Sequence, residues 1–324
     1  MSILITGGAG FIGHHFIDHL LKTTDENIYV FDALTYAGKL DRLREIGAYD
    51  NRRVKIFTVN FNDPIEDEIV RECKDVSVIV HMGAETHVDN SITGPEIFVR
   101  SNVMGTCNML QLARKIKPRL FIYFSTDEVH GPAPEGVQYK ETDALMPTNP
   151  YSATKAGGEM LVRAFGNTYG IPWIITRTMN AFGERQHGEK FIPKIIKSVI
   201  DGTTMTIHSN AQKTKSGSRF YIHCRNIASA IVHLMRNGEL NNVYNIVGEK
   251  EVSNLEMAQQ IAAIIGKPLK YEMVDFHSSR PGHDLRYALD GSKLAASGWT
   301  PPKSFEESLE KSVKWTLENA RWIS

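Results

Sequence analysis

The chain has 324 residues, of which 42% are hydrophobic and 23% are charged, and its 37 basic residues balance its 37 acidic ones. This is the composition of a globular protein, and the zero formal net charge excludes the basic surface expected of a protein that binds nucleic acid or an anionic membrane. No apolar run approaches the length of a membrane span, and we expect no signal peptide before the first strand-like run. The three cysteines are widely spaced and fit reduced thiols, so we expect a cytoplasmic protein.

The first half of the chain alternates short apolar runs with helical patterns. Each run is continuously apolar, which is typical of strands buried on both faces of a parallel sheet. Such a series predicts an α/β fold of the Rossmann type, with a doubly wound parallel sheet. The predicted strands are Ile3–Thr6, Ile28–Phe31, Val54–Val59, Val76–His81, Leu120–Ser125 and Trp173–Arg177, and the helices between them include Phe16–Lys22, Ile97–Ile116 and Tyr151–Tyr169.

After Arg177 the rhythm of strands and helices loosens. A loop rich in glycine, serine, asparagine and lysine spans Ser209–Ser218, and a further apolar run follows at Val243–Val247, with helices at Leu255–Ile265 and Phe305–Asn319. We predict a larger domain over residues 1–177, to which segments near 220–248 return. A smaller C-terminal α/β lobe is predicted from residues 178–219 and 249–324.

A glycine-rich segment, Thr6–Gly13, follows the first predicted strand and opens a helix. Gly7, Gly10 and Gly13 permit a tight turn and let backbone N–H groups approach a pyrophosphate at the helix N-terminus. Asp32 lies 19 residues after Gly13, where a carboxylate takes the hydroxyls of an adenosine ribose. Because a carboxylate there repels a 2′-phosphate, the pattern favours NAD over NADP; an incidental aspartate at a strand end is the alternative.

Tyr151 and Lys155 lie four residues apart at the start of a predicted helix, so their side chains share one face. A nearby ammonium lowers the pKa of a phenol, which lets the phenolate act as a base near neutral pH. Ser125 and Thr126 end the preceding predicted strand. We therefore expect a hydroxyl, the tyrosine and the lysine to converge as in the triad of short-chain dehydrogenases, rather than form an ordinary pair on a helix surface.

Asp127 and Glu128 follow directly after that strand. An oxidoreductase needs only the tyrosine for proton transfer, so two further carboxyl groups indicate a second proton-transfer task. Side chains that diverge at a strand end would let one carboxyl donate while the other accepts. The alternative is a solvated acidic turn.

With these residues in place, the sequence resembles the dTDP-glucose 4,6-dehydratases, a branch of the extended short-chain dehydrogenases, nearly end to end. The segments Leu34–Gly38 and Thr126–Glu128 are specific to that branch, whereas the glycine and tyrosine–lysine motifs are shared by all extended short-chain enzymes. The other matching segments are Thr6–Gly13, His81–Asp89, Asn102–Thr106, Ser125–Val129, Asn149–Gly157, Arg185-Gln186, Glu189-Lys190, Ile192-Pro193 and Arg280–Asp284.

The resemblance implies a nucleotide-sugar 4,6-dehydratase that uses one NAD in a closed redox cycle. Tyr151, aided by Thr126, takes the proton of the sugar 4-hydroxyl while hydride passes from C4 to NAD. Glu128 then removes the C5 proton, and protonated Asp127 gives its proton to the leaving 6-hydroxyl before hydride returns to C6. Asp127 must therefore keep a raised pKa, which burial would supply.

The resemblance also implies binding roles. Arg219 and Arg280 are the candidates for the diphosphate, since planar donors bind phosphate bidentately, and surface salt bridging is the alternative for both. The expected catalytic residues are Thr126, Asp127, Glu128, Tyr151 and Lys155. The expected NAD-binding residues are Gly7, Gly10, Phe11, Ile12, Gly13, Asp32, Asn60, Phe61, Gly83, Ala84, Thr86, Asn102, Ser125, Tyr151 and Lys155. The expected substrate-binding residues are Thr126, Asn180, Lys190, Arg219, Arg280 and His283.

Several positions depart from the pattern of the family, mainly at the nucleotide end of the site. They are His130 for a tyrosine, Asn60 for an acidic residue at the adenine, Asn226 for an aspartate, Met179–Gly183 for a Ser-Asn-Asn-Tyr-Gly segment, and the long loop Ser209–Ser218. These departures leave UDP-, GDP- and CDP-linked sugars open beside dTDP-glucose.

Three alternatives to a dehydratase differ from it in the reaction that they catalyse or in having none. A nucleotide-sugar 4-epimerase or decarboxylase keeps the glycine and tyrosine–lysine motifs but has no use for Asp127 and Glu128. A non-catalytic NAD-binding protein is disfavoured by the complete catalytic set.

We expect no metal site, because His15 and His19 share a helix face without a third ligand. The family resemblance further implies a homodimer built on the helices Ile97–Ile116 and Tyr151–Tyr169.

Overall fold

A computed structural model describes residues 2–276 and 285–323 of the chain. Seven parallel strands form its main sheet, in the order β11-β6-β5-β4-β1-β2-β3. The predicted strands all lie in this sheet, with ends that differ by no more than one residue, and the predicted fold class is confirmed. The strands are β1 (Ser2–Thr6), β2 (Asn27–Asp32), β3 (Val54–Thr58), β4 (Val76–His81), β5 (Leu120–Thr126), β6 (Trp173–Thr178) and β11 (Asn242–Ile246).

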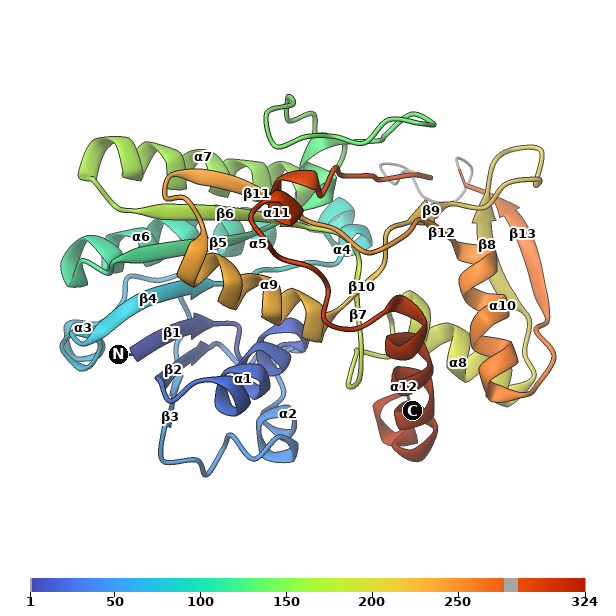
Figure 1. Cartoon of the computed structure of the whole chain (residues 1–324), viewed down its shortest axis with the longest axis horizontal. Helices are drawn as coiled ribbons and strands as arrows, with labels where there is room; N and C mark the ends of the chain where they lie inside the picture. Colours follow the sequence, from blue (N-terminus) through green and yellow to red (C-terminus); the bar gives the residue numbers. More distant parts are fainter. Residues whose placement is uncertain (1, 277–284, 324) are drawn as a thin grey trace.

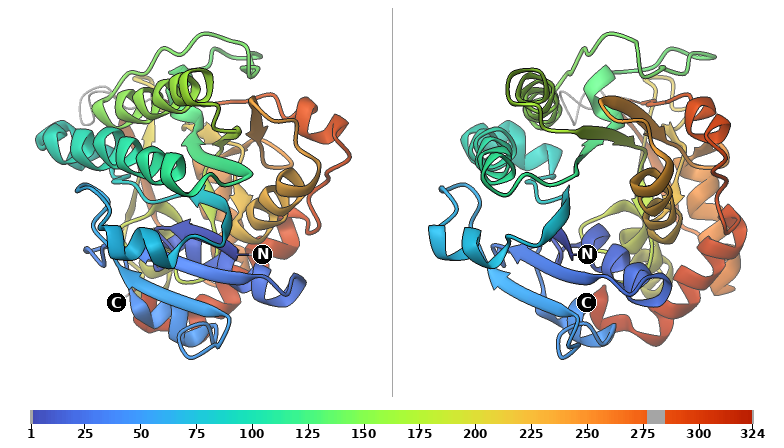
Figure 2. Two further views of the ribbon diagram at one scale, coloured as in Figure 1. Left: turned by 90° about the vertical axis from the view of Figure 1, so that its left-hand side faces the viewer. Right: turned by 60° about the vertical axis from the view of Figure 1, so that its left-hand side comes forward.

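Helices cover both faces of this sheet, because its strands are apolar on both sides (Figures 1 and 2). Helices α1 (Phe11–Thr23) and α9 (Cys224–Asn237) pack with the apolar core of one face. Helices α6 (Gly105–Ile116) and α7 (Pro150–Tyr169) pack with that of the other. Three shorter helices lie between the early strands: α2 (Leu40–Glu45), α3 (Asp67–Glu72) and α4 (Val88–Thr93).

The strand order reverses between β1 and β4. In open α/β sheets, ligands bind beyond the carboxyl ends of the strands at such a switch point. The glycine turn follows β1, Asp32 ends β2, and Thr126 ends β5, so the topology brings all three to the same edge of the sheet.

The predicted helix Ile97–Ile116 is divided into three parts. It consists of α5 (Pro95–Phe98), a π-helical segment η1 (Val99–Met104) and α6. Single π-helical turns are rare and often occur at functional sites. Here the wide turn carries Asn102, which is 1% exposed and bonds to the chain after β4. Apolar spacing cannot distinguish such a turn from a regular helix.

A second lobe lies beyond the main sheet, at the right of Figure 1, and has its own apolar core. Its helices and strands are α8 (Phe191–Asp201), β8 (Met205–Ser209), β12 (Val252–Ser253), α10 (Asn254–Ile265), β13 (Tyr271–Asp275) and α12 (Phe305–Glu318). The remaining elements are η2 (Asp127–His130), β7 (Ala181–Phe182), β9 (Ser218–Arg219), β10 (Ile222–His223), α11 (Ser292–Ala296) and η3 (Ala320–Trp322).

Three two-stranded pairs complete the fold: β7 with β10, β9 with β12, and β8 with β13. The domain boundaries at residues 177, 219 and 248 stay a prediction, since an arrangement in space does not test independent folding. No helix in the described residues is both long and apolar enough to span a membrane.

Candidate active site

The glycine turn between β1 and α1 leaves no room for side chains. Gly7 has a φ of 69°, and its carbonyl accepts a hydrogen bond of 3.0 Å from the Gly10 N–H. A Cβ at Gly13 would lie 2.2 Å from the Gly7 oxygen. Helix α1 begins at Phe11, and its first turn has no acidic residue. Its free N–H groups and positive dipole end therefore suit a pyrophosphate, as predicted for the cofactor.

Asp32 lies beside that turn at the end of β2. One carboxylate oxygen accepts a hydrogen bond of 2.9 Å from the Ala9 N–H, and the other accepts one of 2.9 Å from the Leu34 N–H. Burial raises its pKa, and the two backbone donors and Arg42 oppose that effect. The carboxylate is thus held next to the glycine turn, which is where a ribose diol of a dinucleotide requires an acceptor.

The segment after β4 forms the opposite wall of the expected cofactor site. The Gly83 N–H donates to the Thr6 hydroxyl over 2.9 Å, and a Cβ at Gly83 would lie 2.6 Å from the ring of Phe61. Phe61 is 6% exposed and packs beneath Gly83, whereas Asn60 is exposed beside it. Ala84 is half-buried and Thr86 is exposed at this edge.

The Asn102 side chain is fully used inside the protein. Its amide donates to the Glu85 carbonyl over 3.0 Å and to the Thr154 hydroxyl over 3.0 Å, and its oxygen accepts from the Glu85 N–H over 2.9 Å. Asn102 therefore positions the segment after β4 against α7. The hydroxyl of Ser125, near the end of β5, is buried and has no hydrogen-bond partner among the described residues.

The two predicted catalytic carboxyl groups sit on the one-turn helix η2, directly after β5. The Thr126 hydroxyl accepts from the Glu128 N–H over 3.3 Å and donates to Asp127 Oδ1 over 2.8 Å. Asp127 is 4% exposed, and its Oδ2 is buried without a hydrogen-bond partner among the described residues. The short turn thus carries both carboxyl groups at one strand end.

Helix α7 brings Tyr151 to the carboxyl groups and buries Lys155 four residues later. Its N-cap, Asn149, accepts a hydrogen bond of 2.8 Å from the Ser152 N–H and donates one of 3.1 Å to Glu128 Oε2. Tyr151 is 8% exposed and Lys155 is 3% exposed. One capping residue therefore fixes the start of the helix and the second carboxyl group together.

Burial strongly shifts the pKa values of the ionisable groups in this cluster. Burial raises the pKa of both Asp127 and Glu128, and the charge of Asp127 raises that of Glu128 further. Burial also lowers the pKa of Lys155 to about 7, against the opposing charge of Glu159. The raised pKa expected for Asp127 is therefore present, and the two carboxyl groups together hold a proton above the ordinary carboxyl range.

The behaviour of Tyr151 differs from the expectation. Burial and the charge of Glu128 raise its pKa well above the usual value for a phenol, although the Thr126 hydrogen bond lowers it. Lys155 is close by in sequence, but its ammonium lies 4.4 Å from the ring of Tyr123. A cation placed against the phenol, such as an oxidised nicotinamide ring, would shift this pKa downward.

The substrate-binding candidates border the carboxyl groups from the second lobe. The charges of Arg219 and Lys190 both lower the pKa of Glu128, and Arg219 also lowers that of Asp127. Arg219 donates to the carbonyls of Ser218 and Leu285, each over 2.7 Å. Asn180 is exposed just after β6. Arg280 and His283 lie outside the described residues.

A buried polar network behind η2 escaped the sequence reasoning. Arg177 and Glu159 form an ion pair of 2.8 Å at 1% and 0% side-chain exposure. Arg177 also donates to His130 Nε2 over 2.9 Å, so the other ring nitrogen of His130 donates to the Ala144 carbonyl over 3.0 Å. His130, which stands where the family has a tyrosine, is therefore part of the buried network that supports η2. The spacing of four residues from Lys155 to Glu159 is the signal that sequence reasoning missed.

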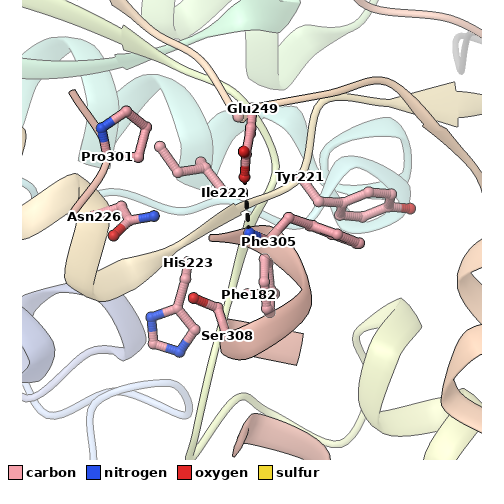
Figure 3. Close-up of a pocket in the computed structure, with 10 residues that line it drawn as sticks. Phe182, Tyr221, Ile222, His223, Asn226, Glu249, Pro301, Phe305 and Ser308 are labelled. Carbon is pink, nitrogen blue, oxygen red and sulfur yellow. Dashed lines mark hydrogen bonds between the residues drawn. The ribbon is translucent and has the colours of Figure 1, made fainter. Parts of the chain in front are cut away.

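Two cavities elsewhere in the structure are separate from the candidate active site. The cavity in Figure 3 has a volume of about 10 Å³, room for no more than one water molecule, and lies between α9 and α12. It is lined in part by Asn226 and Ser308, whose Oδ1 and Oγ atoms have no hydrogen-bond partner among the described residues. A second cavity of about 430 Å³ lies beside α7 and β11 and is lined by Met160, Trp173 and Asn242.

His15 on α1 and His223 both contact Glu184 in the chain that leads to the second lobe. His15 Nε2 lies 2.9 Å from the Glu184 carbonyl, and His223 Nε2 lies 3.0 Å from a carboxylate oxygen of the same residue. Burial lowers the pKa of His15 to about 3. In residues 2–276 and 285–323, no three or more histidine, cysteine, aspartate or glutamate side chains gather as a metal site requires.

Comparisons with known proteins agree with this geometry. A family model described as GDP-mannose 4,6 dehydratase matches residues 4–312. The low-salt glycan biosynthesis protein Agl12 of Haloferax volcanii is 41% identical over 98% of this chain and 99% of its own length. The dTDP-glucose 4,6-dehydratase of Salmonella typhimurium is 35% identical over 100% of this chain and 95% of its own.

A solved structure agrees as well. The dTDP-glucose 4,6-dehydratase DesIV of Streptomyces venezuelae, crystallised with NAD, superposes with a TM-score of 0.91 at 35% identity, covering 99% of this chain and 98% of its own. The expected resemblance, the enzyme class and NAD as the cofactor are thereby confirmed. The chain belongs to the nucleotide-sugar 4,6-dehydratase family of NAD-dependent enzymes.

Proposed function

We propose that this enzyme converts dTDP-glucose to dTDP-4-keto-6-deoxyglucose through an internal NAD cycle. The observation that carries the proposal is the pair of carboxyl groups at the end of β5, buried Asp127 and half-buried Glu128, which lie beside buried Thr126 and the start of α7 and both have a raised pKa. An oxidation alone needs no such pair. Removal of water from adjacent carbons needs one group to accept a proton and another to supply one.

The cofactor fits the edge of the sheet on three observations. The glycine turn is closed to any Cβ, helix α1 presents free N–H groups, and Asp32 is held beside both. A dinucleotide bound there supplies the hydride acceptor at C4 and the hydride donor at C6. Lys155 is buried and lies four residues after Tyr151 on α7, and it is the group proposed to hold the nicotinamide ribose.

In the proposed reaction the chain's own residues move three protons. Tyr151 accepts the proton of the 4-hydroxyl, with Thr126 sharing the hydrogen bond. Glu128, whose charged form accepts a hydrogen bond from Asn149 and is favoured by Lys190, removes the C5 proton. Asp127, whose Oδ2 has no hydrogen-bond partner among the described residues, carries the proton that the leaving 6-hydroxyl takes.

The diphosphate is proposed to lie between the lobes, on the side of Arg219 and Lys190. Both cations already act on the carboxyl groups, so a dianionic substrate there would also be paired electrostatically. Asn180 is proposed to contact the sugar nucleotide beside them.

The choice of dTDP rests on the relatives named dTDP-glucose 4,6-dehydratase. Two of the departures noted in the sequence, Asn60 and the loop Ser209–Ser218, are proposed to bear on this choice. The loop Ser209–Ser218 is folded on itself, with Asn210 Oδ1 accepting from the Thr214 and Lys215 N–H groups over 2.8 and 3.1 Å, and Lys215 pairs with Glu135 over 3.0 Å.

The test is a panel of dTDP-, UDP-, GDP- and CDP-glucose with GDP-mannose, incubated with the purified protein and read as loss of one water by mass spectrometry. We expect dTDP-glucose to lose water faster than the other sugar nucleotides. Faster water loss from another member would show that the enzyme prefers a different nucleobase. No water loss from any member, with NAD added, would overturn the dehydratase proposal in favour of an epimerase or decarboxylase.

We also propose that the enzyme is a homodimer. Ile97, Val99, Met104 and Met160 are between 48% and 53% exposed, and their segments α5, η1 and α7 contact one another. Apolar side chains gathered on neighbouring helices favour a covered surface. We further propose a cytoplasmic location, which the unpaired Cys73, Cys107 and Cys224 support.

A further inference from the structure

Arg42 on α2 is buried without a carboxylate partner. It is 1% exposed, and no acidic side chain in the described part of the chain lies within ion-pair distance of its guanidinium. An unpaired buried cation is unfavourable unless other groups satisfy its donors. Arg42 therefore occupies a place where its hydrogen bonds must offset a large desolvation penalty.

Those hydrogen bonds go to three separate segments. Arg42 Nη1 donates to the Ala9 carbonyl over 3.1 Å and to the Ala37 carbonyl over 2.5 Å, and Nε donates to the Arg185 carbonyl over 3.2 Å. Ala9 belongs to the glycine turn, and Ala37 follows Asp32 in the segment expected beside the ribose. Arg185, at a φ of 65°, comes from the chain that leads to the second lobe.

The same hydrogen bonds reach the cofactor carboxylate. The Ala9 N–H donates to Asp32 over 2.9 Å, and the Lys39 N–H donates to the Ala9 carbonyl over 3.1 Å. Arg42 and Asp32 thus both bond to the backbone of Ala9, which joins the two edges of the proposed cofactor site. Neither edge can move away from the other without breaking a charged hydrogen bond.

The C-terminal segment covers Arg42 from outside. The ring of Trp322 lies 5.3 Å from the Arg42 guanidinium and 5.7 Å from Lys39 Nζ, and its indole N–H donates to Glu45 over 3.1 Å. Arg321 and Arg185 both pair with that same Glu45. Trp322 is 9% exposed, and Figure 2 shows the C-terminal end of the chain close to the early part of the sheet. An aromatic face replaces part of the missing counter-charge.

We propose that Trp322 and Arg42 form a clasp that slows the release of bound NAD. The inference rests on the cofactor site proposed above. With the indole removed, water reaches the guanidinium and competes for its three carbonyl bonds, so the glycine turn and the segment at Ala37 separate more often. Trp322 and Arg42 are positioning residues in this scheme, since neither is proposed to contact the reacting atoms.

The experiment measures the rate at which NAD leaves the full-length protein after it is diluted or dialysed. Trp322→Ala is expected to release NAD about tenfold faster, equivalent to the loss of one charged hydrogen bond. Trp322→Phe should restore most of the slow release, because an aromatic face remains. Arg42→Lys should release NAD as fast as Trp322→Ala, since an ammonium cannot serve three carbonyls arranged around a planar fork.

Two further measurements separate this role from general support of the fold. The KM for the sugar nucleotide and the kcat at saturating NAD should stay at wild-type values in Trp322→Phe and Trp322→Ala. Trp299→Ala, which removes a tryptophan 7% exposed that packs in the apolar core and bonds to Ser229 on α9, should lower the thermal unfolding temperature without changing NAD release. Equal NAD release from wild type, Trp322→Ala and Arg42→Lys would overturn the clasp.

The outcome does not depend on the sugar. A wild-type protein that binds NAD but dehydrates no sugar nucleotide would overturn the proposed function and leave the clasp to be judged by NAD release alone. A wild-type dehydratase whose Trp322 and Arg42 variants keep NAD normally would overturn only the clasp.

Discussion

The two carboxyl groups differ in how their charged forms are stabilised. Glu128 accepts a hydrogen bond from Asn149 and feels the charges of Lys190 and Arg219. Asp127 has one oxygen bonded to Thr126 and one buried oxygen without a partner among the described residues. The pair therefore holds a proton above the ordinary carboxyl range, and the proposed roles of acid for Asp127 and base for Glu128 require that proton to lie on Asp127 when the substrate is bound.

Glu128→Gln tests this assignment. The amide cannot take the C5 proton, so water loss should fall by at least a thousandfold, on the order of 4 kcal/mol in the barrier. Oxidation at C4 should continue slowly and appear as the absorbance of reduced nicotinamide. Glu135→Gln, a control whose side chain is 85% exposed, should change neither step. Equal loss of oxidation and elimination in Glu128→Gln would refute the separate role of Glu128.

The raised carboxyl pKa values also make stability depend on pH. A carboxyl whose folded pKa is raised stabilises the fold below its unfolded pKa, and that contribution is lost as pH rises through the folded value. Asp127→Asn should therefore be more stable than wild type at pH 8, on the order of 1 kcal/mol, and show no advantage near pH 4. Denaturant unfolding at both pH values measures this, with the exposed Asp201→Asn as control. An advantage that is independent of pH would contradict the buried charge.

At the scale of elements, the start of α7 couples structure to chemistry. Asn149 caps the helix through a capping box with Ser152 and also bonds to Glu128. The proline at the first helical position and the polar residue before it made the helix predictable. The bond from the cap to a carboxyl group that lies 21 residues earlier was not predictable, because it depends on where β5 ends.

Two substitutions at the cap separate these functions. Asn149→Ala should lower the free energy of unfolding by about 1 kcal/mol, because the helix loses its cap. Asn149→Ser keeps a capping oxygen but cannot donate an amide hydrogen bond to Glu128, so the acidic limb of the kcat profile should move to higher pH with little loss of stability. A pH profile identical to wild type in both variants would show that the bond to Glu128 has no catalytic effect.

The π-helical segment shows a second limit of sequence reasoning. The apolar pattern over residues 97–116 fitted one long helix, and only tertiary contacts reveal the wide turn at Val99–Met104. The turn brings Asn102 to Glu85 and Thr154. Periodicity reports which face is buried and is insensitive to one extra residue in a turn.

At the scale of the whole molecule, the doubly wound parallel sheet and the helices between its strands followed from the continuous apolar runs and the glycine turn, whereas the order of the strands was not predicted. The contacts between lobes were not predicted either. His15, Glu184 and Arg42 are polar residues with ordinary spacing, and their burial becomes visible only when the second lobe packs against α1 and α2. Polar side chains buried between lobes have no periodic signature.

The proposed dimer is tested by sedimentation. A double substitution, Met104→Glu with Met160→Glu, should convert a dimer to a monomer, because each charge would have to be buried in an apolar contact. Leu317→Glu, at a side chain 38% exposed on α12, should leave the dimer intact. A wild-type protein that sediments as a monomer would contradict the proposal.

The central claim is that one site both oxidises C4 and eliminates water, with the hydride kept within a single turnover. The most direct test uses dTDP-glucose labelled with deuterium at C4 and protein to which no NAD is added, followed by mass spectrometry and NMR of the product. The product should retain the deuterium and carry it at C6. Loss of the deuterium to solvent or to added free NAD, or its return to C4, would contradict the claim.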